Sequence, residues 1–236
     1  AYGQLEGGSF GTFTQAAGLR AASGALSYAF NLQHTETDGI SALGEAFRQS
    51  NGVLDDDRHE NTTLGARVGL TLSDTASLDF TGRWIDTENE LDLNTSTVAD
   101  DSDSRGTSEQ LILGLNGRIA LFDGLTEHRL GISYTNIDRE DRDDIDAINS
   151  ADSSLETNRA WKRKAELQND YYGMENHVIT LGIETEEDTV RSNIATSFLD
   201  FFGNPASINS SVSADILNHA AYLQDQFTVN DISGTA

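Results

Sequence analysis

Aspartate side chains gather in three short segments, where their oxygens could bind a hard cation. The segments are residues 55–57, 100–103 and 141–146. Calcium takes about six to eight oxygen ligands from flexible loops, so a site could draw on segments that meet at one end of the fold. The candidate ligands are Asp55, Asp57, Asp100, Asp101 and Asp103. No segment has the EF-hand pattern, and the alternative is a set of solvated, mutually repelling loops.

The other reactive side chains form no catalytic pattern. Five histidines are scattered without metal-ligand spacing. His34 and His59 flank one long polar stretch and could contact haem or a metal, but isolated histidines are more often surface residues. The sequence has no GxSxG or HExxH motif, no phosphate-binding glycine loop and no cysteine nucleophile. The neighbouring carboxylates have no apolar pocket that would raise a pKa, so we expect that the protein is not an enzyme.

Composition limits the class of protein further. The 236 residues carry a net charge of −24 and include no cysteine, one proline and 21 glycines. This acidity argues against a nucleic-acid partner, because a phosphate backbone needs a basic surface. No apolar run approaches the roughly 18 residues of a transmembrane helix. Membrane-crossing strands remain possible, because their side chains alternate between apolar and polar.

Period-two alternation of apolar and polar residues predicts about nine β-strands. Within residues 61–72, Leu64 and Leu70 fall on one face, whereas Gly65 and Arg67 fall on the other. The predicted strands are 4–21, 25–35, 61–72, 77–86, 107–121, 127–137, 159–172, 177–187 and 216–229. Charged side chains in mid-strand positions would line either the outside of a sandwich or a water-filled lumen. They are Arg67, Arg83, Arg118, Lys162, Lys164 and Glu166.

The connections favour an all-β, antiparallel up-and-down meander. Short turns alternate with long loops, which are predicted at 36–60, 87–106, 138–158 and 188–215. All long loops then lie at one end, as in outer-membrane barrels, whereas a Greek-key sandwich has no reason to keep this asymmetry. Of the 39 acidic residues, 27 lie in the windows 36–60, 86–105, 138–156 and 184–200. The long-loop end is therefore expected to be strongly anionic.

Two segments resemble a known family. EGGSFGTFTQAAGLRA, followed by ALSYAFNLQHTETDGIS, resembles the first two barrel strands of TonB-dependent outer-membrane receptors, with the closest likeness to the vitamin B12 transporter branch. HAAYLQDQFTVND resembles a strand and turn that recur later in such barrels. The most specific pieces are GSFGT and TDGIS.

The resemblance implies that residues 1–236 are about nine strands of a 22-stranded transmembrane barrel that encloses a plug domain. We expect a partial barrel, because the sequence shows no plug, no TonB box and no terminal strand ending in an aromatic residue. Such a receptor lies in the outer membrane of a Gram-negative bacterium and contacts its lipid. It imports cobalamin or a ferric siderophore with energy from TonB, which acts on the plug. Calcium in the extracellular loops would fit the cobalamin branch.

Two other classes of protein remain open at this point. A passive porin-like channel has a similar strand architecture but no plug. A calcium-dependent surface adhesin built from β-sandwiches would bury its apolar residues between two sheets.

Overall fold

The computed structural model describes residues 1–40, 56–91, 93–94, 98–99, 103–145, 152–229 and 232–235. In these ranges the chain forms β-strands and the turns that join them. No helix in this part of the chain is long and apolar enough to cross a membrane. The predicted all-β class is confirmed.

The described ranges contain thirteen strands. They are β1 (Tyr2–Gly7), β2 (Phe13–Ser23), β3 (Leu26–Thr37), β4 (His59–Ser73), β5 (Ala76–Glu90), β6 (Leu93–Asn94), β7 (Val98–Ala99), β8 (Arg105–Leu121), β9 (Thr126–Asp143), β10 (Ser153–Met174), β11 (His177–Leu199), β12 (Pro205–Val229) and β13 (Ile232–Thr235).

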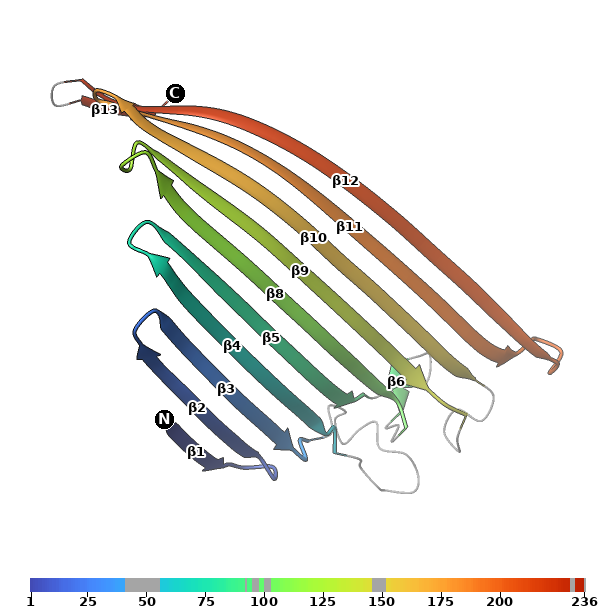
Figure 1. The fold of residues 1–236 in the computed structure, drawn as a ribbon. Coiled ribbons are helices and arrows are strands. Elements are labelled where there is room, and N and C mark those ends of the chain that lie inside the picture. Colours follow the sequence, from blue (N-terminus) through green and yellow to red (C-terminus); the bar gives the residue numbers. More distant parts are fainter. Residues whose placement is uncertain are drawn as a thin grey trace.

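Eleven of these strands form one sheet in the order β1-β2-β3-β4-β5-β8-β9-β10-β11-β12-β13, and every pair is antiparallel. Strands β6 and β7 form a separate two-stranded hairpin between β5 and β8. Figure 1 shows one broad, curved sheet with β1 at one edge and β13 at the other. This is the predicted up-and-down meander, with eleven strands in the sheet rather than nine.

In the large sheet the strands lengthen from 6 residues in β1 to 15 in β4 and 25 in β12, and only the last strand, β13, is short again. A tilted strand crosses a bilayer in about 9–11 residues. The later strands are therefore much longer than one crossing requires, and Figure 1 shows them extending well past the shorter ones.

The predicted first strand, 4–21, is wrong, because two strands occupy this range. Strands β1 and β2 are joined by a turn at residues 8–12, in which the Gly8 N–H donates to the carbonyl oxygen of Thr12 at 2.8 Å. Phe10 and Gly11 have φ angles of 58° and 65°. A left-handed phenylalanine is uncommon and gives no sequence signal, so the reversal was not predicted.

The predicted long loop at 188–215 is also wrong. Strands β11 and β12 pair continuously across it, and only residues 200–204 turn the chain. The four carboxylates at positions 184, 186, 187 and 188 therefore lie on a strand rather than in a loop. Both faces of this long hairpin carry Ser, Asn and Thr. The alternation on which the strand prediction depended is therefore weak there.

Tight turns close the opposite end of the sheet, as predicted. They lie at residues 24–25, 74–75, 122–125 and 175–176. We call this the turn end, and we call the opposite end, which carries the connections 38–58, 91–104 and 144–152, the loop end.

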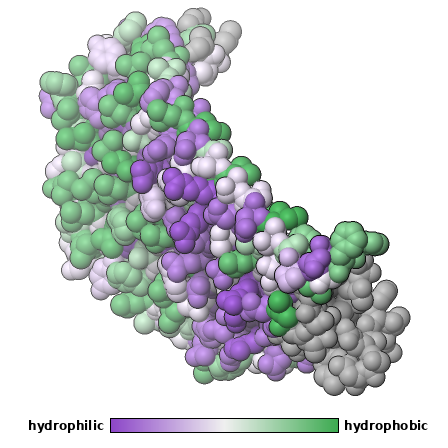
Figure 2. Space-filling model, turned by 90° about the vertical axis from the view of Figure 1, so that its right-hand side faces the viewer, coloured by the Kyte–Doolittle hydropathy of each residue, from purple (hydrophilic) through white to green (hydrophobic). Residues whose placement is uncertain are grey.

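The two faces of the sheet differ in chemistry because the register places alternate residues on opposite sides. One row across the ladder contains Tyr28, Val68, Phe80, Leu115 and Ile132. The adjacent row, on the other face, contains Ser27, Gly69, Asp79, Asn116 and Gly131. Figure 2 shows hydrophobic side chains along the convex side of the curved sheet and hydrophilic ones toward its concave side.

Gly182 makes room for an aromatic ring on the concave face. A Cβ at this position would lie 2.1 Å from the ring of Tyr222, whose hydroxyl donates to Gln168 Oε1 at 3.1 Å. We expect Gly182→Ala to displace the ring and lower the free energy of unfolding by roughly 1–3 kcal/mol, the usual cost of overpacking. Thermal unfolding in detergent measures this change. The control is Gly3→Ala, where a Cβ meets nothing within 4 Å, and equal melting temperatures of the two variants would contradict the prediction.

Asp200 holds the turn between β11 and β12. Its carboxylate accepts hydrogen bonds from the backbone N–H groups of Asn204 (2.8 Å) and Phe202 (2.9 Å). These bonds, chiefly the one from Asn204, hold the pKa of Asp200 below its usual value. Because the folded pKa is the lower one, this stabilisation is complete above the unfolded pKa of about 4 and is lost as the pH falls through the folded pKa.

We therefore expect the hydrogen-exchange protection factors of the Phe202 and Asn204 amides to stay constant from about pH 7 to pH 5 and to decrease below about pH 4. In Asp200→Ala, protection should be lower at neutral pH and should not change over this range. A wild-type protein whose protection follows the same pH course as the variant would refute this role of Asp200.

Candidate functional site

Large apolar side chains remain exposed on the convex face. They form a band across the strands that we call the apolar belt. Its exposed members are Leu26, Phe30, Leu32, Leu64, Leu70, Leu78, Phe80, Leu115, Ile119, Leu130, Ile132, Leu181, Ile183 and Leu223. A continuous exposed apolar surface of this kind marks contact with lipid or a partner.

The apolar belt crosses the strands obliquely. On β3 it ends at Leu32, after which the next convex residue is His34; on β11 it ends at Ile183, followed by Thr185. When the paired residues are followed from strand to strand across the sheet, Thr185 of β11 falls in the same row as Tyr28 of β3 and not in the row of His34. The border therefore shifts by six residues over six strand-to-strand steps, from β3 to β11. A shift of about 3.3 Å along the strand per 4.8 Å across the sheet is a tilt of roughly 35°, within the range of transmembrane barrels.

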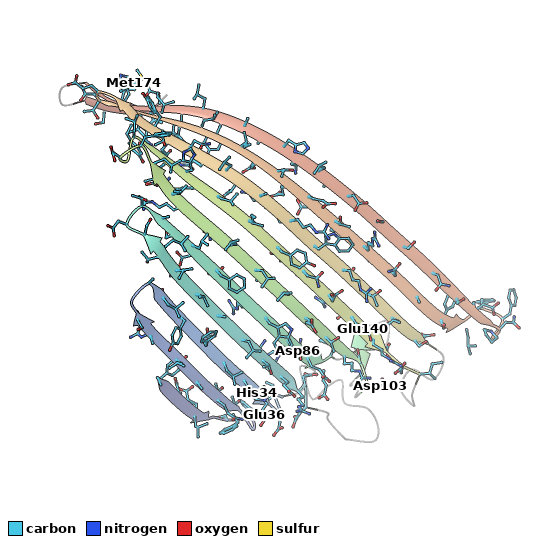
Figure 3. The ribbon with its side chains drawn as sticks, viewed as in Figure 1. His34, Glu36, Asp86, Asp103, Glu140 and Met174 are labelled. Atoms are coloured by element: carbon cyan, nitrogen blue, oxygen red, sulfur yellow. The ribbon has the colours of Figure 1, made fainter. Side chains whose placement is uncertain are left out.

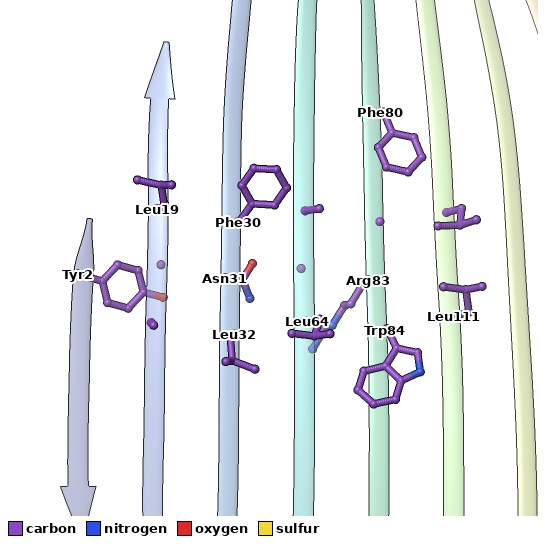
Figure 4. Close-up of a pocket in the computed structure, with 16 residues that line it drawn as sticks. Tyr2, Leu19, Phe30, Asn31, Leu32, Leu64, Phe80, Arg83, Trp84 and Leu111 are labelled. Atoms are coloured by element: carbon purple, nitrogen blue, oxygen red, sulfur yellow. The ribbon is translucent and has the colours of Figure 1, made fainter.

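An apolar groove lies within this belt. Figure 4 shows it around β3, β4 and β5, where Phe30, Leu64, Phe80 and Trp84 surround a volume of about 630 Å³. Gly82 leaves its floor open. Most of the residues that line the groove are apolar residues of the convex face, with Asn31 and Arg83 as the polar exceptions, so it suits a hydrocarbon chain better than a polar nutrient.

The concave face carries a network of ion pairs near the turn end. Arg118 and Arg129 both contact Glu127, each at 2.5 Å, and Arg129 also contacts Asp170 at 3.0 Å. Asp170 accepts a further hydrogen bond from Thr180 at 2.7 Å. Glu127 and Asp170 are only 7% and 4% exposed. Buried carboxylates are tolerated when they are paired in this way, so the network is a fixed scaffold rather than a free acid or base.

Two lysines bridge carboxylates further toward the loop end. Lys162 lies 2.9 Å from Glu186 and 3.6 Å from Asp188. Lys164 lies 2.9 Å from Glu166 and 3.2 Å from Glu184. These contacts cross from β10 to β11 or run along β10, so they link the strands through their polar face.

The register places all six predicted mid-strand charges on the concave face. They are Arg67, Arg83, Arg118, Lys162, Lys164 and Glu166. Three further members of this face were not predicted from the sequence, namely Glu127, Asp170 and Tyr222. The same alternation could have placed them, but their partners depend on the register between strands. A polar recess of about 310 Å³ opens here beside Asp79, Asn116, Gly131 and Glu166.

Acidic residues surround the loop end. Figure 3 shows His34, Glu36, Asp86, Asp103 and Glu140 there, with Met174 at the turn end. Three of the candidate calcium ligands lie outside the described residues: Asp55, Asp100 and Asp101. Asp57 and Asp103 precede β4 and β8, the two strands that flank β5 in the sheet. Within the described ranges no group of three or more His, Asp or Glu residues could hold a metal ion.

The histidines beside the first long connection do not form a shared site. His34 bonds to Thr62 at 2.9 Å on the convex face, whereas His59 bonds to Asn89 at 2.6 Å on the concave face. Because the two rings lie on opposite sides of the sheet, they cannot bind one haem or metal between them.

Two aromatic rings project from the tip of the β11–β12 hairpin. Phe201 and Phe202 are 96% and 82% exposed, and their ring centroids are 5.5 Å apart. This is the most exposed apolar feature at the loop end among the described residues.

No family model matches the sequence, and no curated protein matches it significantly. Solved structures do match its fold. The ferric yersiniabactin uptake receptor of Yersinia pestis aligns with 97% of this chain at 12% identity and a TM-score of 0.61, and the alignment covers 39% of that receptor. The ferripyoverdine receptor of the Pseudomonas aeruginosa outer membrane aligns with 97% of this chain at 10% identity and a TM-score of 0.70, over 35% of its length.

A ferric citrate transporter aligns with 96% of the chain at 11% identity and a TM-score of 0.63, over 34% of its own length. Such low identities establish the fold and leave the ligand open. The chain spans between 34% and 39% of the length of these three receptors. It therefore has the fold of part of a TonB-dependent receptor barrel.

Proposed function

We propose that this chain is part of the barrel of an outer-membrane receptor that binds a scarce nutrient and imports it into a Gram-negative cell with energy from TonB. The observation that supports this most is the combination of the oblique apolar belt with a polar, ion-paired concave face on an eleven-stranded meander. A tilted barrel wall in lipid needs the first feature, and a hydrated lumen needs the second.

A ferric siderophore is the cargo that we favour. The structural neighbours include receptors for ferric yersiniabactin, ferripyoverdine and ferric citrate, which are iron chelates. Cobalamin rests only on the sequence resemblance of the first strands. Calcium ordering of the loop end stays a proposal, with Asp57 and Asp103 as the candidate ligands within the described residues.

The geometry supports separate roles for two regions of the barrel wall, namely ligand capture at the loop end and passage along the concave face. The long strands from β9 to β12 carry their connections far beyond the apolar belt, where a ligand from outside would meet them first. The concave face would then line the path inward. Its charges are largely compensated by one another, so it would offer a polar wall to a plug domain without holding a charged ligand tightly.

The two alternative classes fit less well. A β-sandwich adhesin needs two stacked sheets, whereas the described residues form one large sheet and one small hairpin. A passive porin could have the same wall, and it differs in needing no energy. Dependence on TonB therefore distinguishes the two transport classes.

Uptake by cells tests the proposal directly. The complete reading frame is expressed in a Gram-negative strain that lacks its own siderophore and cobalamin receptors, and labelled ferric siderophores and labelled cobalamin are supplied in turn. We expect uptake of a ferric siderophore that falls to background when TonB is deleted. Uptake that is unchanged without TonB would point to a passive channel and contradict the proposal.

A further inference from the structure

Three arginines surround Trp161 on the convex face. Arg159 and Arg163 precede and follow Trp161 by two residues on β10, so all three side chains lie on the same side of the sheet. Arg191 of β11 lies directly opposite Arg159 in the register, and its guanidinium carbon is 5.0 Å from the centroid of the Trp161 ring. The side chains of Arg159 and Arg163 are 70% and 62% exposed. The cluster therefore presents cationic groups on the outside of the wall.

The carboxylates nearby are mostly engaged. Asp138 contacts Arg159 at 3.0 Å and also accepts a hydrogen bond from Asn136 at 2.6 Å. Asp215 accepts a hydrogen bond from Thr189 at 2.7 Å.

Arg163 and Arg191 are less tightly paired than Arg159. Arg163 reaches Glu187 only at 3.5 Å. Within the described part of the chain, no carboxylate is in ion-pair distance of Arg191, whose partner is the Trp161 ring. Like charges directly opposite each other destabilise a sheet, so the Arg159–Arg191 pair favours an external anion between them.

The position of the cluster indicates which anion. Toward the turn end, the next convex residues on β10 are Ala165 and Leu167, and β11 presents Ile183 at the same level as Leu167. The cluster therefore begins at the loop-end border of the apolar belt with Arg163, and Trp161, Arg159 and Arg191 continue from there toward the loop end. In membrane proteins, tryptophan and arginine at this border lie at the level of the lipid headgroups. A lipid whose chains cover the belt would have its headgroup beside the three arginines.

We propose that Arg159, Arg163 and Arg191, together with Trp161, bind the phosphate of a membrane lipid. Guanidinium groups bind phosphate oxygens through paired, charge-assisted hydrogen bonds. The convex face is separated by the sheet from the concave face, so this site is distinct from the path proposed for the nutrient. The inference rests on the membrane location in the proposed function and names a partner that this function does not require.

Lipid binding to the purified full-length protein in uncharged detergent tests the proposal. The probes are phosphatidic acid, diacylglycerol with the same chains, and inorganic phosphate alone. We expect phosphatidic acid to bind much more tightly than diacylglycerol. The triple variant Arg159→Gln, Arg163→Gln, Arg191→Gln should bind phosphatidic acid about 100-fold more weakly, which corresponds to roughly five-fold per arginine.

The double variant Arg67→Gln, Arg83→Gln is the matched control, because it removes arginines from the concave face of the same sheet and should bind as the wild type does. If the triple variant does not fold, Arg191→Gln alone should lose about five-fold. Equal affinity for diacylglycerol, wild-type affinity in the arginine variants, or displacement of the lipid by inorganic phosphate would each overturn the proposal. Because binding is measured on purified protein, a failure of nutrient uptake in cells would be recognised separately.

Discussion

The backbone hydrogen-bond ladder is the constraint on which the rest of this structure depends. A strand in lipid has no water to satisfy its N–H and C=O groups, so every one of them must pair with a neighbouring strand. The ladder does this on both sides of each strand from β3 to β11, and its register shifts only beside turns, near Ser73 and Met174. The same ladder also decides the face of every side chain. A slip of one residue on β9 would move Glu127 and Arg129 to the apolar side and Leu130 to the polar side.

The two faces then follow different physical rules. The convex face lacks a packed core and leaves Leu181, Ile183 and Leu223 at least half exposed, which is unfavourable in water and favourable against hydrocarbon. The concave face satisfies its charges locally, as the contacts of Arg129 with Glu127 and Asp170 illustrate. Together these features describe a wall between lipid and water. The arginine cluster beside Trp161 lies where the apolar side of that wall meets the headgroups.

The class, the meander and the turn end could be predicted from the sequence, because alternation and tight turns are local signals. The strand prediction was wrong where both faces of a strand are polar or where a turn has no local signature. The range 188–215 is paired as β11 and β12, yet both of its faces carry polar residues, so it resembled a loop. The range 4–21 conceals a turn at Phe10, whose left-handed backbone has no local signature. The partners of Glu127 and Asp170 could not be predicted either, because pairing across strands depends on a register that one sequence does not state.

The most direct test of the central claim uses the absence of cysteine, which allows single labels to be placed without background. Spin labels at Leu181, Ile183, Glu184 and Glu186 of β11, in protein reconstituted into a lipid bilayer, would report their access to oxygen dissolved in the lipid. We expect high oxygen access at Leu181 and Ile183, which face the lipid, and low access at Glu184 and Glu186, which face the polar interior. The same access at all four positions would contradict this expectation, because the sheet would then not separate lipid from a polar interior.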